Sequence, residues 1–289
     1  VDVNGKGEKH FQVIINGKAL VDHMSYSELN VAQRSDTYNA EDIEGLYQVG
    51  WADGNRLDVR GGELKGYLDV RDGSEGTAKN SGVPNSPNYK GIPYYIKKLN
   101  EFARTFARVF NEGMVKVDKT NPDTWTAADA AGNINNKGHA DGYILDTLDG
   151  AAPSGIRFFS IREISSADFT DTTSDQTIFS SYSKMTAKNF SVSADILNDV
   201  KNIATAGVSG RNGDSSNLVN LLSQRHNSSM FTEGAPEDFM KALVATLGVD
   251  SQQANRLSDN QGVVVSQVEN RRASMSGVSI DEEMSNIVK

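Results

Sequence analysis

Residues 95–109 read Tyr-Ile-Lys-Lys-Leu-Asn-Glu-Phe-Ala-Arg-Thr-Phe-Ala-Arg-Val, and this stretch constrains the fold most strongly. Its large apolar residues are spaced alternately four and three positions apart, at Tyr95, Leu99, Phe102, Phe106 and Val109. That heptad spacing gathers them on one face of a helix, as in a seam that is buried against other helices. We therefore predict a long helix here that packs in a helical bundle.

A second long helix is predicted near the end of the chain. Pro236 suits the first position of a helix, and no proline follows it as far as Met275. Between residues 254 and 275 a seam again steps by three and four positions. A helix of about 40 residues would be about 60 Å long. The two helices together predict a rod-like helical part of the molecule.

Residues 1–60 are predicted to form β structure. Apolar side chains alternate over residues 11–15, and Asn16-Gly17 suits a type I′ turn. Residues 19–21 are then expected to return as the partner strand. These signals predict an antiparallel hairpin at the start of the chain.

A second hairpin, a helix and a loop are predicted after it. Residues 47–51 alternate up to Asp53-Gly54, and residues 57–59 would lead away as the partner strand. Apolar residues at helical spacing predict a helix over residues 62–72. Residues 73–88 are rich in Gly, Ser, Asn and Pro and are predicted to be a flexible surface loop.

Residues 114–189 differ in character from both flanks. Short apolar strands are predicted at 143–148 and 156–161, separated by turns rich in Asn, Gly, Asp and Thr, which indicates a small β-rich insertion. Beyond it, residues 207–216 are predicted to be a loop that leads into a short helix. The predicted class is α+β: an elongated helical bundle with antiparallel β-hairpins. Its core domain comprises residues 1–113 plus 190–289, and the insertion comprises residues 114–189.

Composition excludes several classes of function. The 289 residues include 29 basic and 38 acidic side chains, a net charge of −9, which argues against nucleic acid as a partner. The chain has no cysteine, so disulfides and thiolate metal sites are excluded. No apolar run approaches the ~20 residues that a membrane-spanning helix needs. The hydrophobic share of 37% is low and favours two or more small cores over one large one.

The chain shows no catalytic motif. None of its four histidines, His10, His23, His139 and His226, lies three or four residues from another, and we interpret them as surface or turn residues. Phosphate-binding glycine loops and a G-x-S-x-G nucleophile are also missing from the sequence. We therefore predict no enzyme, no cofactor and no metal site.

Acidic and aromatic clusters are interpreted structurally. Asp281-Glu282-Glu283 fits the start of a helix, where carboxylates complement the helix dipole. The pairs Tyr94-Tyr95 and Phe158-Phe159 are more typical of a core than of a ligand site. An alternative stays open: if Tyr143, Phe158 and Phe159 were exposed in a row, the insertion would suit an adhesin or a glycan-binding module.

Several stretches resemble flagellar hook-associated protein 1, the family of hook–filament junction proteins. Residues 61–72, Gly-Gly-Glu-Leu-Lys-Gly-Tyr-Leu-Asp-Val-Arg-Asp, are similar to the family's G-G-x-L-x-G-L-L-x-x-R-D segment. Residues 268–283, Val-Glu-Asn-Arg-Arg-Ala-Ser-Met-Ser-Gly-Val-Ser-Ile-Asp-Glu-Glu, resemble its L-E-N-x-R-x-S-x-S-G-V-x-L-D-E-E segment. Residues 14–21, 99–111, 190–204 and 217–221 match further segments in the same order.

The resemblance implies a structural component of the bacterial flagellum, without enzymatic activity. Such a protein is secreted by the flagellar export apparatus, lies outside the cell and adapts the hook to the filament. The implied partners are the flagellar hook protein, the second hook–filament junction protein, neighbouring copies of the same chain and an export chaperone. Residues 114–189 would face outward.

The resemblance also locates an expected core and an expected boundary. We expect a bundle core at Leu99, Phe102, Phe106, Val264, Val268 and Met275, with Leu64 and Leu68 beside it. Because both ends match internal positions of the family, we expect a longer natural protein with a further helix at each end. Without those helices, residues 1–289 are expected to be monomeric.

Overall fold

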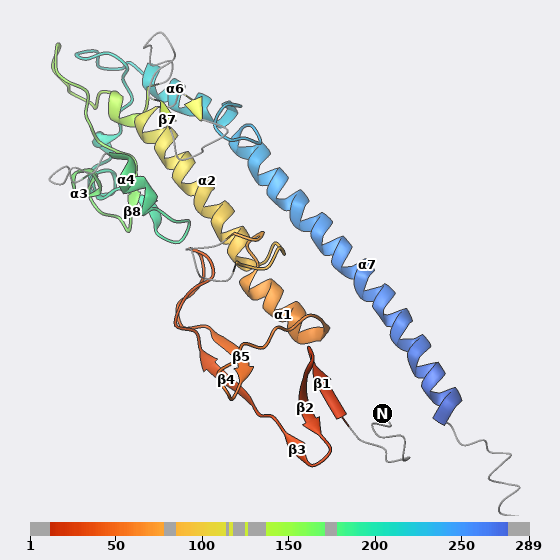
Figure 1. Cartoon of the computed structure of the whole chain (residues 1–289). Coiled ribbons are helices and arrows are strands. Elements are labelled where there is room, and N and C mark those ends of the chain that lie inside the picture. The colour runs from red at the N-terminus through yellow and green to blue at the C-terminus, as the bar shows by residue number, and fades with distance from the viewer. Residues whose placement is uncertain are drawn as a thin grey trace, which may run out of the picture. The chain divides into compact units, whose positions relative to one another are not determined.

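A computed structural model describes residues 12–77, 85–113, 116–117, 125–126, 137–170 and 178–276 (Figure 1). Helices and small antiparallel sheets make up this part of the chain, which confirms the α+β class. The chain divides into two compact units, residues 1–224 and residues 225–289. The predicted division into residues 1–113 plus 190–289 and residues 114–189 stays a prediction.

The first unit begins with the predicted hairpin. Strands β1 (Gln12–Ile15) and β2 (Lys18–Asp22) pair antiparallel, and β3 (Ser25–Tyr26) extends the sheet beside β2. Asn16 and Gly17 have φ angles of 48° and 82°. A type I′ turn needs positive φ at both central residues, so the predicted turn is confirmed.

The second predicted hairpin has a different partner. Strand β5 (Tyr47–Trp51) exists, but it pairs over its whole length with β4 (Leu29–Gln33). After the turn the chain returns to β5 through a single bridge, between Gly50 and Arg56. The predicted partner strand at residues 57–59 is therefore wrong. The reason is that β4 offers a five-residue ladder to β5, whereas the returning chain diverges after one bridge.

Helices α1 (Gly62–Asp72) and α2 (Ile92–Glu112) confirm two predicted helices. The described ends of the loop between them are paired with each other. Ser74 bridges to Lys90, and the Gly91 N–H donates to the Gly73 carbonyl at 3.0 Å. Ser74 and Ser86 are buried. The predicted loop is confirmed at these ends, but they are not a plain surface loop, because two of their side chains are buried and their backbone groups pair within the loop. Residues 78–84 of the prediction lie outside the described residues.

The C-terminal half of α2 carries the main core of the first unit. Strands β8 (Phe159–Ile161) and β9 (Phe190–Val192) pair antiparallel, and β8 lies against α2 together with helix α4 (Ile178–Ser183), as Figure 1 shows. Ala107, Phe169, Tyr182 and Met185 are buried in this core. Phe159, Ile161, Ile164 and Phe190 pack against them.

The segment predicted to be a β-rich insertion has mixed structure where it is described. Strands β6 (Lys116–Val117) and β7 (Trp125–Thr126) are two residues each. Helix α3 (Ser166–Phe169) and helix α4 also fall within this segment, and the Phe169 and Tyr182 rings pack 5.1 Å apart. Residues 143–148 contribute only an isolated bridge, from Tyr143 to Ala206, instead of the predicted strand.

Short helices complete the first unit. They are η1 (His139–Asp141), α5 (Ala194–Asn198), η2 (Val200–Asn202), α6 (Ser216–Ser223) and η3 (Gln224–His226), the last of which runs into the second unit. Helix α6 confirms the predicted short helix.

The second unit consists mainly of one helix. Helix α7 (Pro236–Ser276) runs unbroken for 41 residues and begins at the predicted proline. Phe231 and Phe239 pack ring against ring at 4.7 Å at its start, and both are buried. Among the described residues, no helix combines the length and apolarity that crossing a membrane requires. Residues 281–283 lie outside the described part of the chain.

Candidate functional site

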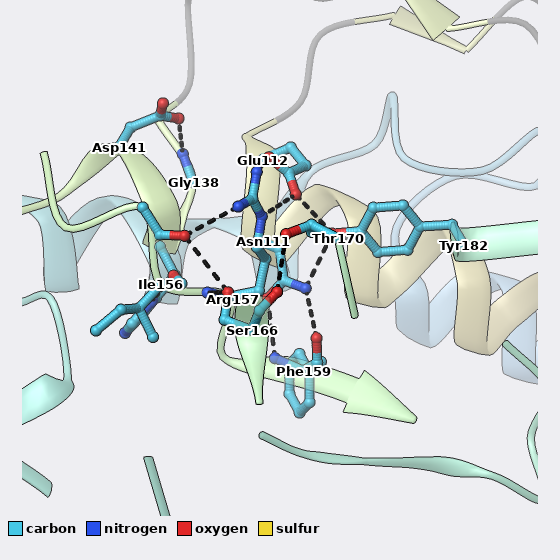
Figure 2. Close-up of polar contacts among 12 residues, drawn as sticks. Asn111, Glu112, Gly138, Asp141, Ile156, Arg157, Phe159, Ser166, Thr170 and Tyr182 are labelled. Carbon is cyan, nitrogen blue, oxygen red and sulfur yellow. Dashed lines mark hydrogen bonds and ion pairs between the residues drawn. The ribbon is translucent and has the colours of Figure 1, made fainter. Parts of the chain in front are cut away.

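A cluster of polar side chains lies at the C-terminal end of α2 (Figure 2). Asn111, fully buried, pairs with the backbone of β8 as another strand would. Its Nδ2 donates to the Phe159 carbonyl at 2.8 Å, and its Oδ1 accepts from the Phe159 N–H at 2.9 Å. Because a buried backbone group without a partner is costly, this one side chain satisfies the strand and fixes it to the helix.

Glu112 connects the same end of α2 to two further segments. Its Oε1 accepts from Arg157 Nε at 2.9 Å and from the Tyr182 hydroxyl at 2.8 Å, and its Oε2 accepts from Arg157 Nη2 at 3.2 Å. The Tyr182 hydroxyl in turn accepts from Asn111 Nδ2 at 3.0 Å. We call Asn111, Glu112, Arg157 and Tyr182 the α2 clamp.

Electrostatics keep Arg157 protonated and Tyr182 neutral, because the pKa of each is raised. Burial, reinforced by the Glu112 charge, raises the pKa of Tyr182 well above its usual value, so its hydroxyl stays a donor. Burial alone would lower the pKa of Arg157, but its bonds to Glu112 raise that pKa on balance. A bidentate guanidinium–carboxylate pair is among the stronger hydrogen-bonded contacts in proteins. The α2 clamp is therefore suited to holding three segments together.

The chain around Arg157 is fixed by further bonds. The Arg157 N–H donates to Ser166 Oγ at 2.8 Å, and the Ser166 N–H donates to Asp195 Oδ2 at 2.5 Å. The Asp141 carboxylate accepts from the Gly138 N–H at 2.9 Å, while burial raises the Asp141 pKa. All of these contacts are between groups of the chain itself.

His139 is buried, which corrects the prediction of a surface or turn histidine. Both ring nitrogens bond to backbone groups, Nδ1 to the Ile156 carbonyl at 2.8 Å and Nε2 to the Ala204 N–H at 2.9 Å. Burial lowers its pKa, and the bond to Ile156 opposes that shift. Among the described residues, no group of three or more His, Asp or Glu side chains is placed to hold a metal ion.

A second polar network joins the β4–β5 sheet to α1. Arg71 Nε and Nη2 donate to the two Asp72 oxygens at 2.8 and 2.7 Å, and its Nη1 donates to the Tyr47 carbonyl at 2.7 Å. The buried Arg34 lies 3.4 Å from both Asp42 and Asp72 and stacks on Tyr38 at 4.2 Å. Arg71 and Asp72 thus hold the end of α1 against β5.

A pocket of about 480 Å³ lies beside this network. Its polar lining comes from β4, β5 and the turns that follow them: Asn30, Arg34, Ser35, Asp36, Tyr38, Gln48, Asn55 and Arg56. Arg34 is already balanced by Asp42 and Asp72, and the Asp36 carboxylate accepts from the Thr37 N–H at 2.7 Å. Both bonds of Arg34 are made by Nη2, and its Nε and Nη1 are buried without a hydrogen-bond partner, so the guanidinium is only partly satisfied within the chain.

The residues predicted for a bundle core are only partly covered within this chain. Leu64, Leu99, Val264 and Val268 have exposed fractions of 44%, 38%, 50% and 60%. Leu68, Phe102 and Phe106 are half-buried, and Met275 lies in the last turn of α7, where side chains are not described. The face of α2 that is most completely buried is the neighbouring one, with Asn100, Ala103, Ala107 and Asn111. The bundle core stays a prediction.

The aromatic pair Phe158-Phe159 packs as a core pair, as predicted. The two rings are 4.9 Å apart, and Phe110 of α2 lies 5.2 Å from Phe158 and 5.1 Å from Phe159. Tyr143 is half-buried, like both phenylalanines. These side chains do not form the exposed row that a glycan-binding insertion would need.

Sequence comparison relates one part of the chain to a known protein. Over 100 residues the chain is 33% identical to flagellar hook-associated protein 1 of Bacillus subtilis (strain 168). The chain is therefore similar in part to a flagellar protein. The match covers 33% of this chain and 20% of that relative, so the chain spans about a fifth of the relative's length. No family model and no solved structure matches the chain.

Sequence reasoning missed the α2 clamp and the buried histidine. Asn111 and Glu112 close a predicted helix, but their partners lie 45 to 71 positions away in the sequence. The one signal available was the pair of polar residues that follows an apolar seam at the end of α2. A single histidine with no neighbouring ligand carries no pattern that would distinguish a buried position from an exposed one.

Proposed function

We propose that this protein is a structural component of the bacterial flagellum, at the junction between hook and filament. The observation that carries the proposal is the 33% identity to flagellar hook-associated protein 1 over 100 residues. That similarity supports a flagellar protein in general. The assignment to the junction rests on the resemblance of residues 61–72 and 268–283 to segments of that family.

The site geometry supports a mechanical role. In both polar clusters the side chains bond to other parts of the chain, so that helix ends are tied to strands: Asn111 to β8, and Arg71 to β5. Bidentate pairs and side chain–backbone bonds of this kind resist displacement of one element against another. A protein that links a flexible hook to a stiff filament needs such connections.

A position between hook and filament determines which partners we propose. They are the hook protein on one side, the second junction protein on the other and neighbouring copies of this chain around the axis, with a chaperone before export. The exported protein would lie outside the cell, on the flagellum. We propose no enzymatic activity.

Deletion of the encoding gene tests the proposal. We expect cells that still build hooks but carry no filaments, with monomeric flagellin in the culture medium, because subunits would have nothing on which to assemble. Electron microscopy of the cells and immunoblotting of the medium would measure both effects.

Complementation provides the control for that test. The wild-type gene should restore filaments, and so should Asp58→Asn, which changes only an exposed pair with Arg60. A deletion strain with normal filaments would refute the proposal. Loss of the hook as well would place the protein earlier in assembly and would also contradict it.

A further inference from the structure

His139 ties together three segments that lie far apart in the sequence. The fully buried ring packs edge-on against Phe158, with 5.5 Å between the ring centres. Nδ1 bonds to the Ile156 carbonyl, and Nε2 bonds to the Ala204 N–H. Because a carbonyl only accepts and an amide N–H only donates, Nδ1 carries the proton and Nε2 carries none. The ring is thus a neutral imidazole whose tautomer is fixed by its two partners.

The Ala204 segment is held from two sides. On the side of η1, Ala206 exchanges backbone bonds with Tyr143 at 2.8 and 3.2 Å, next to the bond from Ala204 to His139. On the other side, Asn217 Nδ2 of α6 donates to the Ala204 carbonyl at 2.8 Å. Ala204 is fully buried. Residues 203–206 therefore connect η1 with α6, the last α-helix of the first unit.

Protonation would affect only one side of the ring. A second proton on Nε2 would face the Ala204 N–H, so that a donor would meet a donor and one hydrogen bond would be lost. The bond from Nδ1 to the Ile156 carbonyl would remain, since Nδ1 is already the donor. A buried charge without a partner adds a further cost.

Most charged groups on the neighbouring segments bond to other parts of the chain. The charged side chains on the segments next to the ring include Arg108, Glu112, Lys137, Asp141, Arg157, Lys201 and Asp214. Glu112 pairs with Arg157, Lys137 Nζ donates to the Gly207 carbonyl at 3.3 Å, and Asp141 accepts from Gly138. Asp214 accepts from the N–H groups of Gly207 and Ser216. Burial is the main cause that lowers the pKa of the imidazole, and the bond to the Ile156 carbonyl opposes that shift.

We propose that His139 is an acid-sensitive latch, whose protonation releases the Ala204 N–H and so weakens the attachment of residues 203–206 to residues 137–143, while the bond to Ile156 holds. The release loosens the chain that leads through α6 to the second unit. A lowered folded-state pKa means that the open form takes up the proton more readily. The latch is therefore fully closed above the free imidazole pKa of about 6.5 and weakens as the pH falls below it.

The expected size of the effect follows from that linkage. Between the free and the folded pKa, the population of the open form rises about tenfold for each unit of pH. From pH 7.5 to pH 5.0, the protection of the Ala204 amide against hydrogen exchange should fall by up to about thirtyfold, after correction for the intrinsic rate. The protection of the Phe159 amide, which bonds to Asn111, should stay the same.

Nuclear magnetic resonance of the whole chain tests the latch. At pH 7.5, long-range ¹⁵N correlation should show the Nδ1–H tautomer of His139, and amide exchange at both pH values should show the selective loss at Ala204. His139→Gln, which can donate and accept without titrating, should make the Ala204 protection independent of pH. The wild-type tautomer remains a test even if this variant fails to fold.

Three results would overturn the proposal. They are an Nε2–H tautomer at pH 7.5, an Ala204 protection that does not change down to pH 5.0, and an equal fall at Ala204 and Phe159. The last would show that acid opens the whole unit and not the latch.

Discussion

Asn111 shows how a single side chain can replace a strand in this protein. Its amide makes both bonds to Phe159 that a neighbouring strand would make, and it lies directly before Glu112, which holds Arg157 and Tyr182. The α2 clamp therefore depends on two consecutive residues at one helix end. Removing either end of a buried contact leaves the other without a partner, and the cost is larger when the remaining group is charged.

At the residue scale, we expect Glu112→Gln to lower the free energy of unfolding by about 2 kcal/mol, because Arg157 would lose its charged partner. Tyr182→Phe should cost about 1–2 kcal/mol, since the hydroxyl's bonds with Glu112 and Asn111 both disappear while these two residues keep other partners. Urea unfolding followed by tryptophan fluorescence measures both changes. The two tryptophans, Trp51 and Trp125, both belong to the first unit.

Asp58→Asn is the matched control for these variants. Its pair with Arg60 is exposed, and such pairs contribute about 1 kcal/mol or less. If Glu112→Gln cost no more than Asp58→Asn, the α2 clamp would not stabilise the unit as we describe.

At the element scale, local signals were sufficient for several parts of the fold. The turn at Asn16-Gly17, the helix over residues 62–72 and the helix that begins at Pro236 are decided by neighbouring residues, and all three are confirmed. The partner of β5 is decided by competition between distant segments, which the turn at Asp53-Gly54 does not reveal. The helices α3 and α4 were not predicted, because they lie in a stretch rich in turn residues.

Glycine at position 138 permits the close approach of two elements. A Cβ atom at Gly138 would overlap the backbone of Asn111 and Gly113 at the end of α2, and backbone cannot move aside as a flexible side chain can. We expect Gly138→Ala to destabilise the first unit by about 3 kcal/mol, at the upper end of overpacking costs. Thermal unfolding monitored by circular dichroism and tryptophan fluorescence would measure the loss.

Gly66→Ala is the counterpart of that variant. Gly66 lies within α1, and a Cβ there would meet nothing within 4 Å. Alanine is the better helix former, so this change should stabilise the unit by about 0.5–1 kcal/mol. If the two substitutions changed the stability of the first unit equally, the close approach of Gly138 to the end of α2 would not be what limits the packing of η1 on α2.

At the scale of the whole molecule, a net charge of −9 and the lack of cysteine agree with the proposed structural role, although neither decides it. The similarity to flagellar hook-associated protein 1 covers a third of the chain. The central proposal is that the protein lies where the hook meets the filament. It can be tested by locating the protein on the flagellum.

Immunogold electron microscopy tests that position most directly. Antibodies against the purified chain, adsorbed against the deletion strain, would be applied to intact flagella. We predict gold particles at a single position on each flagellum, where the hook meets the filament. Label along the filament, at its tip alone or on the cell surface would contradict the account.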